Sequence, residues 1–291
     1  MAGSLAVLIA TSGRPRIVAD LVRSLETQTR APDRVICVGA APADIAEIEP
    51  GPTISVLVGR RGSAHQRNDA LELGGALFDT IVFFDDDFVP SRFWLERAEQ
   101  LFAKFPEFAC LTGNVLADGN RTAGVPCDEA RAIVARRDAQ AFGDFSIDAE
   151  VSPYGCNMAF RGSAVRDMRF DERLPLYAWL EDKDFGERVR ARGSYGKAAP
   201  LWGVHMGAKS GKAPGVRLGY SQVANAVYLA RKGTVGASFA LRLVAGNIAS
   251  NLARSLRPEA WIDRRGRLRG NLIALADAAI GRLAPERVVE L

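Results

Sequence analysis

Two patterns of apolar residues alternate along the first part of the chain. Short runs of β-branched and aliphatic residues, typical of strands buried on both faces, are separated by stretches with apolar side chains at helical spacing. We expect strands at 5–10, 34–38, 53–58, 80–84 and 108–116. We expect helices at 16–27, 63–73 and 91–104. This alternation predicts an α/β fold whose parallel or mixed sheet is covered by helices.

The pattern changes near residue 215. Long helical stretches rich in small residues replace the strands, at 219–230, 237–255 and 271–283. We therefore expect one large domain, residues 1–215, and a helical C-terminal extension, residues 216–291. Lys232, Arg242 and Arg254 interrupt the apolar stretches, and a membrane span needs about 20 apolar residues in a row. These helices are therefore not expected to cross a bilayer.

The net charge of +4 is concentrated in one part of the chain. The segment from Arg254 to Gly270 holds six arginines and two acidic residues, a charge of +4, and the other 32 basic and 32 acidic residues balance. A local basic patch can face nucleic acid, anionic lipid or water. The balanced charge elsewhere and the lack of aromatic interleaving argue against a nucleic-acid-binding protein, so no nucleic-acid partner is expected.

Cysteine use and the N-terminus indicate a cytoplasmic location. The start of the chain lacks basic residues, and the apolar run at 5–10 is too short for an export signal, so we expect a strand there. A reducing compartment would keep the cysteines as buried thiols, and without a C-x-x-C pair they form no zinc motif. The four cysteines are Cys37, Cys110, Cys127 and Cys156.

Three consecutive aspartates, Asp85, Asp86 and Asp87, directly follow the apolar run at 80–84. Carboxylates cannot remain in the core of a buried strand, so the strand must end there and place the acids at its C-terminal edge. Ligands bind at that edge of open α/β sheets. Clustered carboxylates repel one another unless a hard cation neutralises them, so the triplet predicts a Mg²⁺ or Mn²⁺ site. The alternative is a solvated acidic turn.

Five segments in order resemble one enzyme family. They read "ATSGRP" at 10–15, "GRRGSAHQRNDAL" at 59–71, "FFDDDFVP" at 83–90, "YGCNMAFRGSA" at 154–164 and "WLEDKDFGERVRARG" at 179–193. Together they resemble the inverting family 2 glycosyltransferases, whose GT-A fold is a Rossmann-like mixed sheet flanked by helices. The resemblance implies transfer of a sugar from a nucleotide-diphosphate donor to an acceptor hydroxyl.

The resemblance also implies roles for the residues of the metal and donor sites. Asp87 would bind the metal, with His205 as a further metal or diphosphate ligand. Asp85 and Asp86 would contact donor ribose, sugar or a metal-bound water, in a division that the sequence leaves open. A lone histidine is more often structural. The donor-binding residues implied elsewhere are Thr11, Arg14, Arg61, Arg67 and Asn68, and the arginines could instead form surface salt bridges.

An inverting transfer also needs a base, because the acceptor hydroxyl must lose a proton as it attacks. The family position for this base matches Asp182, in the first turn of a helix expected to run to Arg192, where the helix dipole keeps a carboxylate ionised. The alternative is that Asp182 is an ordinary first-turn acid, since acids are common there. The acceptor and sugar pocket would include Gly155, Asn157, Trp179 and Glu181, for which a tight turn and a core tryptophan are the alternatives.

The donor, the acceptor and the partners are less specified. Many relatives carry an acid soon after the second strand that recognises uracil, but here none occurs before Asp44, so UDP is only the default. The acceptor expected is a saccharide or lipid-linked saccharide, in bacterial surface or exopolysaccharide synthesis. The amphipathic stretch at 237–256 can pack on the domain, form a homodimer, or lie peripherally on the inner face of a membrane.

Two other interpretations fit parts of the sequence. A sugar nucleotidylyltransferase also joins an α/β nucleotide fold to a metal, but it needs a Gly-rich basic N-terminal loop that residues 11–14 match poorly. A nucleic-acid-binding protein would use the arginine-rich segment.

The stretch Gly207–Lys212, "GAKSGK", is one residue too short for a phosphate loop and lacks its final Ser or Thr. We expect it to be a mobile basic loop over the diphosphate.

Overall fold

The computed structural model describes residues 3–141, 143–209 and 214–291, which form two compact units. The first unit comprises residues 1–61, 65–169 and 188–211, and the second comprises 62–64, 170–187 and 212–291. The second unit therefore joins the C-terminal helices to a segment from the middle of the chain, which carries the predicted base. The division into domains at residue 215 stays a prediction.

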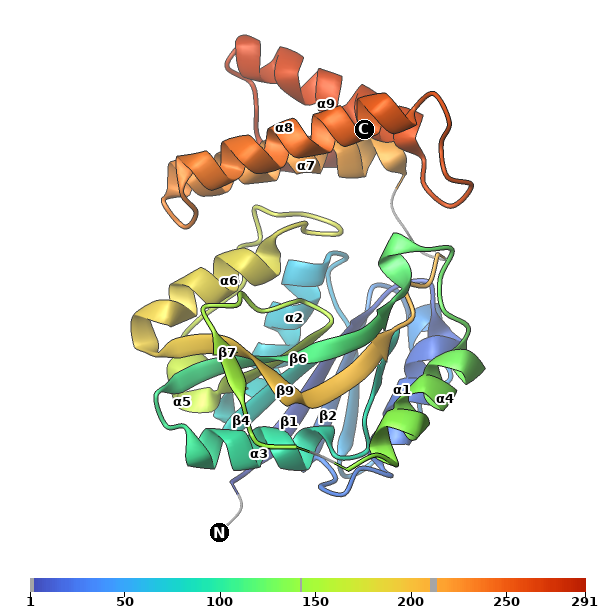
Figure 1. Ribbon diagram of the computed structural model, residues 1–291, viewed down its shortest axis with the longest axis vertical. Helices are drawn as coiled ribbons and strands as arrows, with labels where there is room; N and C mark the ends of the chain where they lie inside the picture. The colour runs from blue at the N-terminus through green and yellow to red at the C-terminus, as the bar shows by residue number, and fades with distance from the viewer. Residues whose placement is uncertain (1–2, 142, 210–213) are drawn as a thin grey trace. The chain divides into compact units, whose positions relative to one another are not determined.

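A single mixed sheet forms the first unit, as Figure 1 shows. Its order among the described residues is β3-β2-β1-β4-β8-β6-β9-β5, and β7 pairs with β9. Strands β3, β2, β1 and β4 are parallel, β6 is parallel to β9, and β8 lies antiparallel between β4 and β6. The strands are β1 Leu5–Thr11, β2 Arg34–Gly39, β3 Ile54–Val58, β4 Thr80–Asp85, β5 Phe88–Pro90, β6 Phe108–Asp118, β7 Ile147–Ala149, β8 Asn157–Arg161 and β9 Ser194–His205. The α/β class with a mixed sheet and flanking helices is confirmed.

Helices cover both faces of the sheet, which is why the strands read as continuous apolar runs. Alternate residues of β1 and β4 on one face pack against α1 and α3, in a core that includes Val7, Phe84 and Trp94. On the opposite face, α2 lies against the same strands, and its Gln66 donates to the carbonyls of Thr11 and Val38 at 2.8 and 2.7 Å. These hydrogen bonds join α2 to the carboxyl ends of β1 and β2. The α-helices up to residue 189 are α1 Pro15–Leu25, α2 Ser63–Glu72, α3 Trp94–Lys104, α4 Cys127–Asp138, α5 Gly162–Val165 and α6 Glu181–Val189.

Some elements differ from the sequence-based expectation. Helix α4 is not among the helices that the sequence predicts, because only Ala130 and Val134 of it are buried and its apolar stripe is thin. Strand β5 is only three residues long, too short for a periodic pattern. Residues 1–2 of the predicted N-terminal segment, and residues 210–212 of Gly207–Lys212, lie outside the described residues.

In the second unit, three helices pack around a core that includes Tyr220, Val223 and Ala274. They are α7 Gly215–Lys232, α8 Ala237–Arg254 and α9 Arg264–Ala279. Helix α9 begins seven residues before the predicted Asn271, because the Asp263 carboxylate accepts from the Gly266 amide and caps it. No helix among the described residues is both long enough and apolar enough to cross a membrane.

Close contact between α7 and α9 depends on two glycines. A Cβ on Gly219 would lie 2.0 Å from the Arg267 carbonyl oxygen, and one on Gly270 would lie 2.0 Å from that of Val216. Buried amides complete the contact, since Asn271 donates to the carbonyl of Gly219 at 2.7 Å. The small residues that the sequence shows in these helices are thus required by backbone approach.

Lys232 at the end of α7 holds the start of α6 in place. Its ammonium donates to Asp171 at 2.6 Å and to both carboxylate oxygens of Asp184 at 2.8 and 2.9 Å. The Asp184 side chain is fully buried and pairs with this ammonium. The Lys232 hydrogen bond, acting against burial, lowers the pKa of Asp171.

Replacing Lys232 with methionine should destabilise the second unit. The change leaves the Asp184 carboxylate buried without its cation, and loss of one partner of a buried pair costs about 3 kcal/mol. Urea unfolding followed by circular dichroism measures the effect. The neighbouring Arg231→Gln is the control, because Arg231 is exposed and has no ion pair among the described contacts. Equal stability of the two variants would contradict this role of Lys232.

Candidate active site

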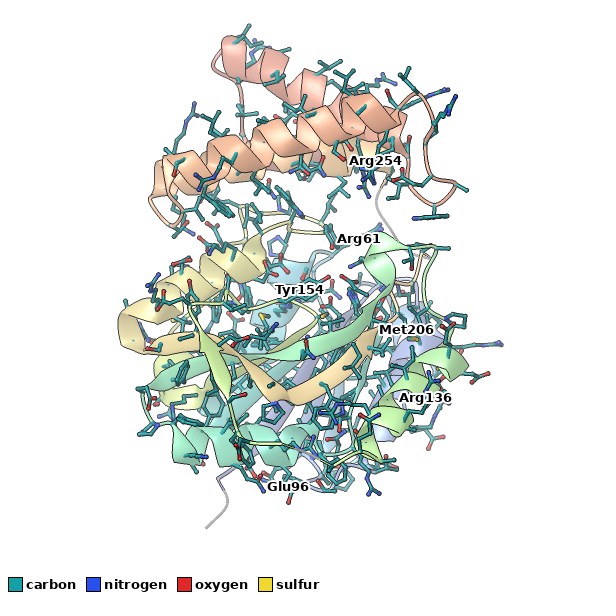
Figure 2. The ribbon with its side chains drawn as sticks, viewed as in Figure 1. Arg61, Glu96, Arg136, Tyr154, Met206 and Arg254 are labelled. Atoms are coloured by element: carbon teal, nitrogen blue, oxygen red, sulfur yellow. The ribbon has the colours of Figure 1, made fainter. Side chains whose placement is uncertain are left out.

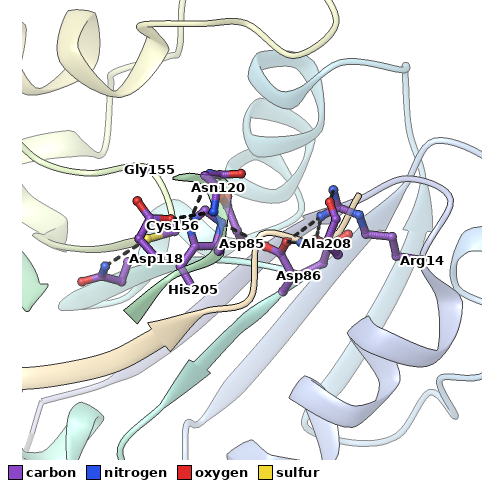
Figure 3. Close-up of polar contacts among 12 residues, drawn as sticks. Arg14, Asp85, Asp86, Asp118, Asn120, Gly155, Cys156, His205 and Ala208 are labelled. Carbon is purple, nitrogen blue, oxygen red and sulfur yellow. Dashed lines mark hydrogen bonds and ion pairs between the residues drawn. The ribbon is translucent and has the colours of Figure 1, made fainter. Parts of the chain in front are cut away.

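The carboxyl edge of the sheet gathers the polar residues that the strand order brings together. Strand β4 ends at Asp85, and β9 ends at His205. In the register of β9, His205 lies opposite Phe88 of β5 and opposite Asp118, the last residue of β6. The aspartates and the histidine therefore lie together although 117 residues separate Asp87 from His205 in sequence. Figure 3 shows this group of side chains.

Asp85, Asp87 and His205 form a cluster that could hold a metal ion. One ligand atom from each lies within 4.8 Å of the others, and both Asp87 and His205 are buried. The Nε2 atom of His205 lies 3.2 Å from Asp87 Oδ1. Two carboxylates and one imidazole nitrogen are donors that suit a divalent cation such as Mn²⁺. The donor set therefore fits the predicted metal.

His205 is fixed from its other side by Asp118, which the sequence analysis did not single out. The Nδ1 atom of His205 lies 3.1 Å from Asp118 Oδ1, and the Tyr154 hydroxyl donates to Asp118 Oδ2 at 3.1 Å. The Asn120 amide nitrogen also lies 3.3 Å from Nδ1. Burial alone would lower the pKa of His205, but the carboxylates of Asp118 and Asp87 raise it to about 10. Asp118 thus orients the ring so that Nε2 points into the cluster.

Asp86 points away from this cluster, toward the end of β1. Its carboxylate accepts from the Thr11 hydroxyl at 2.8 Å and from Arg14 Nη1 at 2.7 Å. Burial raises the pKa of Asp86, and the neighbouring charge of Asp87 raises it further, whereas the charge of Arg14 lowers it. For Asp87, burial works in the same direction, but the hydrogen bond and charge of His205 outweigh it and lower the pKa. The adjacent carboxylates thus occupy different environments.

Arg14 connects the first strand edge to the segment after β9. Besides Asp86, its Nη1 lies 3.1 Å from Asp87 Oδ2, and its Nη2 donates to the carbonyl of Ala208 at 3.0 Å. The Ala208 amide in turn donates to Asp87 Oδ2 at 2.7 Å. Arg14 therefore forms ion pairs with two of the three aspartates, Asp86 and Asp87. A guanidinium at this position could also bind a charged ligand.

The other predicted donor residues divide into buried and exposed groups. Arg67 is buried, and its Nη2 donates to Asp85 at 2.9 Å and to the carbonyl of Gly155 at 3.1 Å. Asn68 is also buried. Arg61, labelled in Figure 2, is exposed. Arg67 therefore joins the aspartate triplet to the loop before β8, whereas Arg61 remains at the surface.

The structure differs from the expectation for Asn157. The side chain is fully buried, its Oδ1 accepts from the Gly113 amide, and its Nδ2 contacts the Cys156 sulfur at 3.2 Å. An amide turned into the sheet offers no exposed atom to a sugar. Asn157 instead fixes β8 against β6, where Gly113 is needed because a Cβ there would lie 2.5 Å from Asn157 Oδ1.

The segment with the predicted base belongs to the second unit. Asp182 lies in the first turn of α6, as predicted, and its Oδ1 accepts from the Lys183 amide at 2.7 Å. Glu181 is buried, and the half-buried Trp179 accepts from Asn225 through its carbonyl at 2.8 Å.

The backbone before Asp182 is strained. Leu176, Ala178 and Leu180 have φ angles of 58°, 50° and 75°, in the left-handed region that residues with side chains rarely adopt. Such residues persist only where the surrounding structure imposes them, and they concentrate at functional sites. This strain brackets Trp179 and immediately precedes Glu181.

Sequence reasoning missed Asp118 and Tyr154. Asp118 ends β6 two residues beyond the strand end that the sequence predicts, at the start of a stretch rich in Gly, Asn and Asp. One signal in the sequence could have found it: Asp118 follows an apolar run, just as Asp85 follows the run at 80–84. Its position beside His205 depends on the pairing of β6 with β9, which no local pattern encodes.

Comparisons with known proteins find similarity in structure. No family model matches the sequence, and no curated protein matches it. The mannosyltransferase PcManGT from Pyrobaculum calidifontis, in complex with GDP-Man and Mn²⁺, has a TM-score of 0.57 at 18% identity, over 99% of this chain and 83% of that one. This chain has a glycosyltransferase fold.

A second solved structure supports the same conclusion. Residues 1–349 of TarS from S. aureus, in complex with UDP-GlcNAc, match with a TM-score of 0.57 at 15% identity, over 98% of this chain and 82% of that one. Another structure of the same TarS fragment matches over 99% of this chain and 90% of that one, with a TM-score of 0.54. The glycosyltransferase fold therefore extends over nearly the whole chain.

Proposed function

We propose that this protein is a metal-dependent inverting glycosyltransferase. It moves a sugar from a nucleotide-diphosphate donor to a hydroxyl of a saccharide or lipid-linked saccharide, with bacterial surface or exopolysaccharide synthesis as the setting. The observation that carries the proposal is the cluster of Asp85, Asp87 and His205 at the carboxyl edge of a glycosyltransferase fold. A structural neighbour with that fold is a mannosyltransferase in complex with GDP-Man and Mn²⁺.

Asp85, Asp87 and His205 would hold the cation. When bound, it would supply positive charge to the diphosphate of the leaving group. Mn²⁺ is favoured over Mg²⁺ because Mg²⁺ takes oxygen ligands almost exclusively, whereas this site includes an imidazole. Asp85 is thereby assigned to the metal rather than to the donor ribose or sugar.

The donor side of the site is assigned to the residues around the first strand edge. Arg14 offers charge to the diphosphate, and Thr11 with Asp86 holds that guanidinium in place. Arg67 acts through Asp85, whose carboxylate it contacts. UDP remains the default nucleotide of the donor. The Asp44 carboxylate accepts from the amides of Gly13 and Ala41 at 2.7 and 2.9 Å, so it is held beside the ends of β1 and β2.

Asp182 is assigned as the base. The acceptor oxygen attacks the anomeric carbon from the face opposite the diphosphate, and a C–O bond forms as the bond to the phosphate oxygen breaks. The hydroxyl proton passes to the Asp182 carboxylate, and the nucleoside diphosphate leaves with the electron pair. Trp179 provides an apolar wall for the acceptor, and Glu181 with Gly155 shapes the sugar pocket.

Asp118 is assigned as a positioning residue for His205. Asp118→Asn should weaken Mn²⁺ binding about 10- to 100-fold, because carboxylates behind a metal-bound histidine fix its orientation and tautomer. Calorimetric titration of Mn²⁺ into the protein without a nucleotide measures this affinity. Tyr154→Phe, which removes only the hydroxyl bound to Asp118, should have a smaller effect. Unchanged Mn²⁺ affinity in Asp118→Asn would contradict the assignment.

The proposed activity is tested with a panel of UDP-, GDP-, CDP- and dTDP-sugars in the presence of Mn²⁺. Release of the nucleoside diphosphate from one donor, abolished by chelation of the metal, is the expected result. Proton NMR of the product then reports the anomeric configuration, which should be opposite to that of the donor. Retention of configuration would contradict the inverting mechanism. Absence of turnover with every donor and acceptor would contradict the proposed activity.

Partners and location remain predictions that complete this proposal. A cytoplasmic location is in keeping with four free cysteines, of which Cys37, Cys110 and Cys156 are buried. A homodimer through the C-terminal helices, and peripheral contact of these helices with the inner face of a membrane, both depend on what their exposed surface can bind.

A further inference from the structure

Helix α8 exposes a stripe of apolar side chains. Leu241 and Leu252 are 71% and 59% exposed, and Leu256, just beyond the helix, is 83% exposed. Leu241 and Leu252, eleven residues apart, lie on one side of the helix with the exposed Ala245 and Ala249 between them. Trp261, in the connection to α9, is 42% exposed. We call Leu241, Leu252, Leu256 and Trp261 the apolar stripe.

Arginines surround the C-terminal end of this stripe. Arg254 and Arg264 share the carboxylate of Glu259, at 2.7 and 2.8 Å, so the acid compensates only part of their charge. Among the described residues, Arg257 and Arg265 have no ion-pair partner, and both are exposed. Figure 2 shows Arg254 at this end of α8. Exposed leucines and a tryptophan are thus combined with uncompensated positive charge.

We propose that the apolar stripe and the exposed Arg254, Arg257 and Arg265 form a docking surface for an anionic lipid membrane. Leucine and tryptophan side chains favour the boundary between headgroups and acyl chains, and arginines bind the headgroup phosphates. A second copy of the chain fits less well, because the same patch on it carries the same positive charge, whereas headgroup phosphates carry the opposite charge. The surface requires no catalytic activity, so this inference stands independently of the proposed reaction.

Co-sedimentation of the full chain with vesicles tests the proposal. Vesicles of equal parts phosphatidylcholine and phosphatidylglycerol at low salt should bind the protein, and vesicles of phosphatidylcholine alone should bind it at least about tenfold less. Leu256→Ser and Arg257→Gln should each weaken binding to the anionic vesicles about fivefold or more. A leucine that enters the bilayer and an arginine at the membrane surface each contribute on this scale.

Matched controls separate docking from general stickiness. Leu77→Ser removes a leucine of the first unit that is 72% exposed, and Arg136→Gln removes an exposed arginine of α4; both should bind like the wild type. Circular dichroism checks that all variants are folded. Wild-type protein that stays free of anionic vesicles would overturn the proposal. A dimer in sedimentation velocity, lost in Leu256→Ser while vesicles bind neither protein, would assign the surface to a second copy instead.

Discussion

Asp87→Asn should abolish Mn²⁺-dependent donor binding and lower kcat/KM for transfer by about 10³, the scale expected when a group that stabilises transition-state charge is lost. Asp87 is the aspartate with contacts to His205, Arg14 and Ala208 together, and its lowered pKa keeps it ionised. The asparagine has nearly the same shape but lacks the charge. Calorimetry with the nucleoside diphosphate, with and without Mn²⁺, separates binding from turnover.

Glu129→Gln is the control for this variant, because Glu129 is an exposed acid on α4 of the same unit. It removes one negative charge without touching the cluster and should behave like the wild type. If Asp87→Asn bound both Mn²⁺ and donor normally, the metal site would not lie at the aspartate triplet. An equal loss in both variants would indicate a dependence on net charge instead.

Asp182→Asn should lower kcat by about 10²–10⁴ while donor affinity stays within about twofold, because a general base contributes on this scale and acts only on the acceptor. The asparagine can still accept from the Lys183 amide as Asp182 does, so the helix start should be preserved. Steady-state kinetics with saturating donor and acceptor gives kcat. Calorimetry with the unreacted donor gives its affinity.

Glu187→Gln provides the control on the same helix. Glu187 accepts from Lys183 at 2.6 Å, so this variant changes a second carboxylate of the same helix that has not been assigned to the reaction. It should retain near-normal turnover. Near-normal turnover of Asp182→Asn would show that Asp182 is not the base, and loss of donor affinity in that variant would point to a structural role.

The fold was accessible from sequence because its strands are buried on both faces. Runs such as the one that ends at Asp85 have no amphipathic ambiguity, and the acids that follow them mark the strand end. The family resemblance pointed to Asp87 and His205 as metal candidates. A local pattern could not connect these two residues, because they are far apart in sequence. The resemblance also pointed to Asp182 in the first turn of α6, where the structure places it.

The remaining features depend on tertiary contacts. Asp85 and Asp86 are neighbours in sequence, yet one faces the cluster and the other faces Arg14, because the chain turns between β4 and β5. Asn157 was assigned to a sugar pocket from its loop, but the pairing of β8 with β6 turns its amide inward. Asp118 meets His205 only through the register of β6 and β9. No periodicity in sequence reports such registers.

Calorimetric titration of UDP, GDP, CDP and dTDP, each with and without Mn²⁺, tests the central claim most directly. Binding of one nucleoside diphosphate only when Mn²⁺ is present is the predicted result, and it would also identify the donor base. Binding that is equally tight in a chelator would contradict the role of Asp85, Asp87 and His205. The absence of binding to any nucleotide, with or without the metal, would contradict a nucleotide-sugar enzyme.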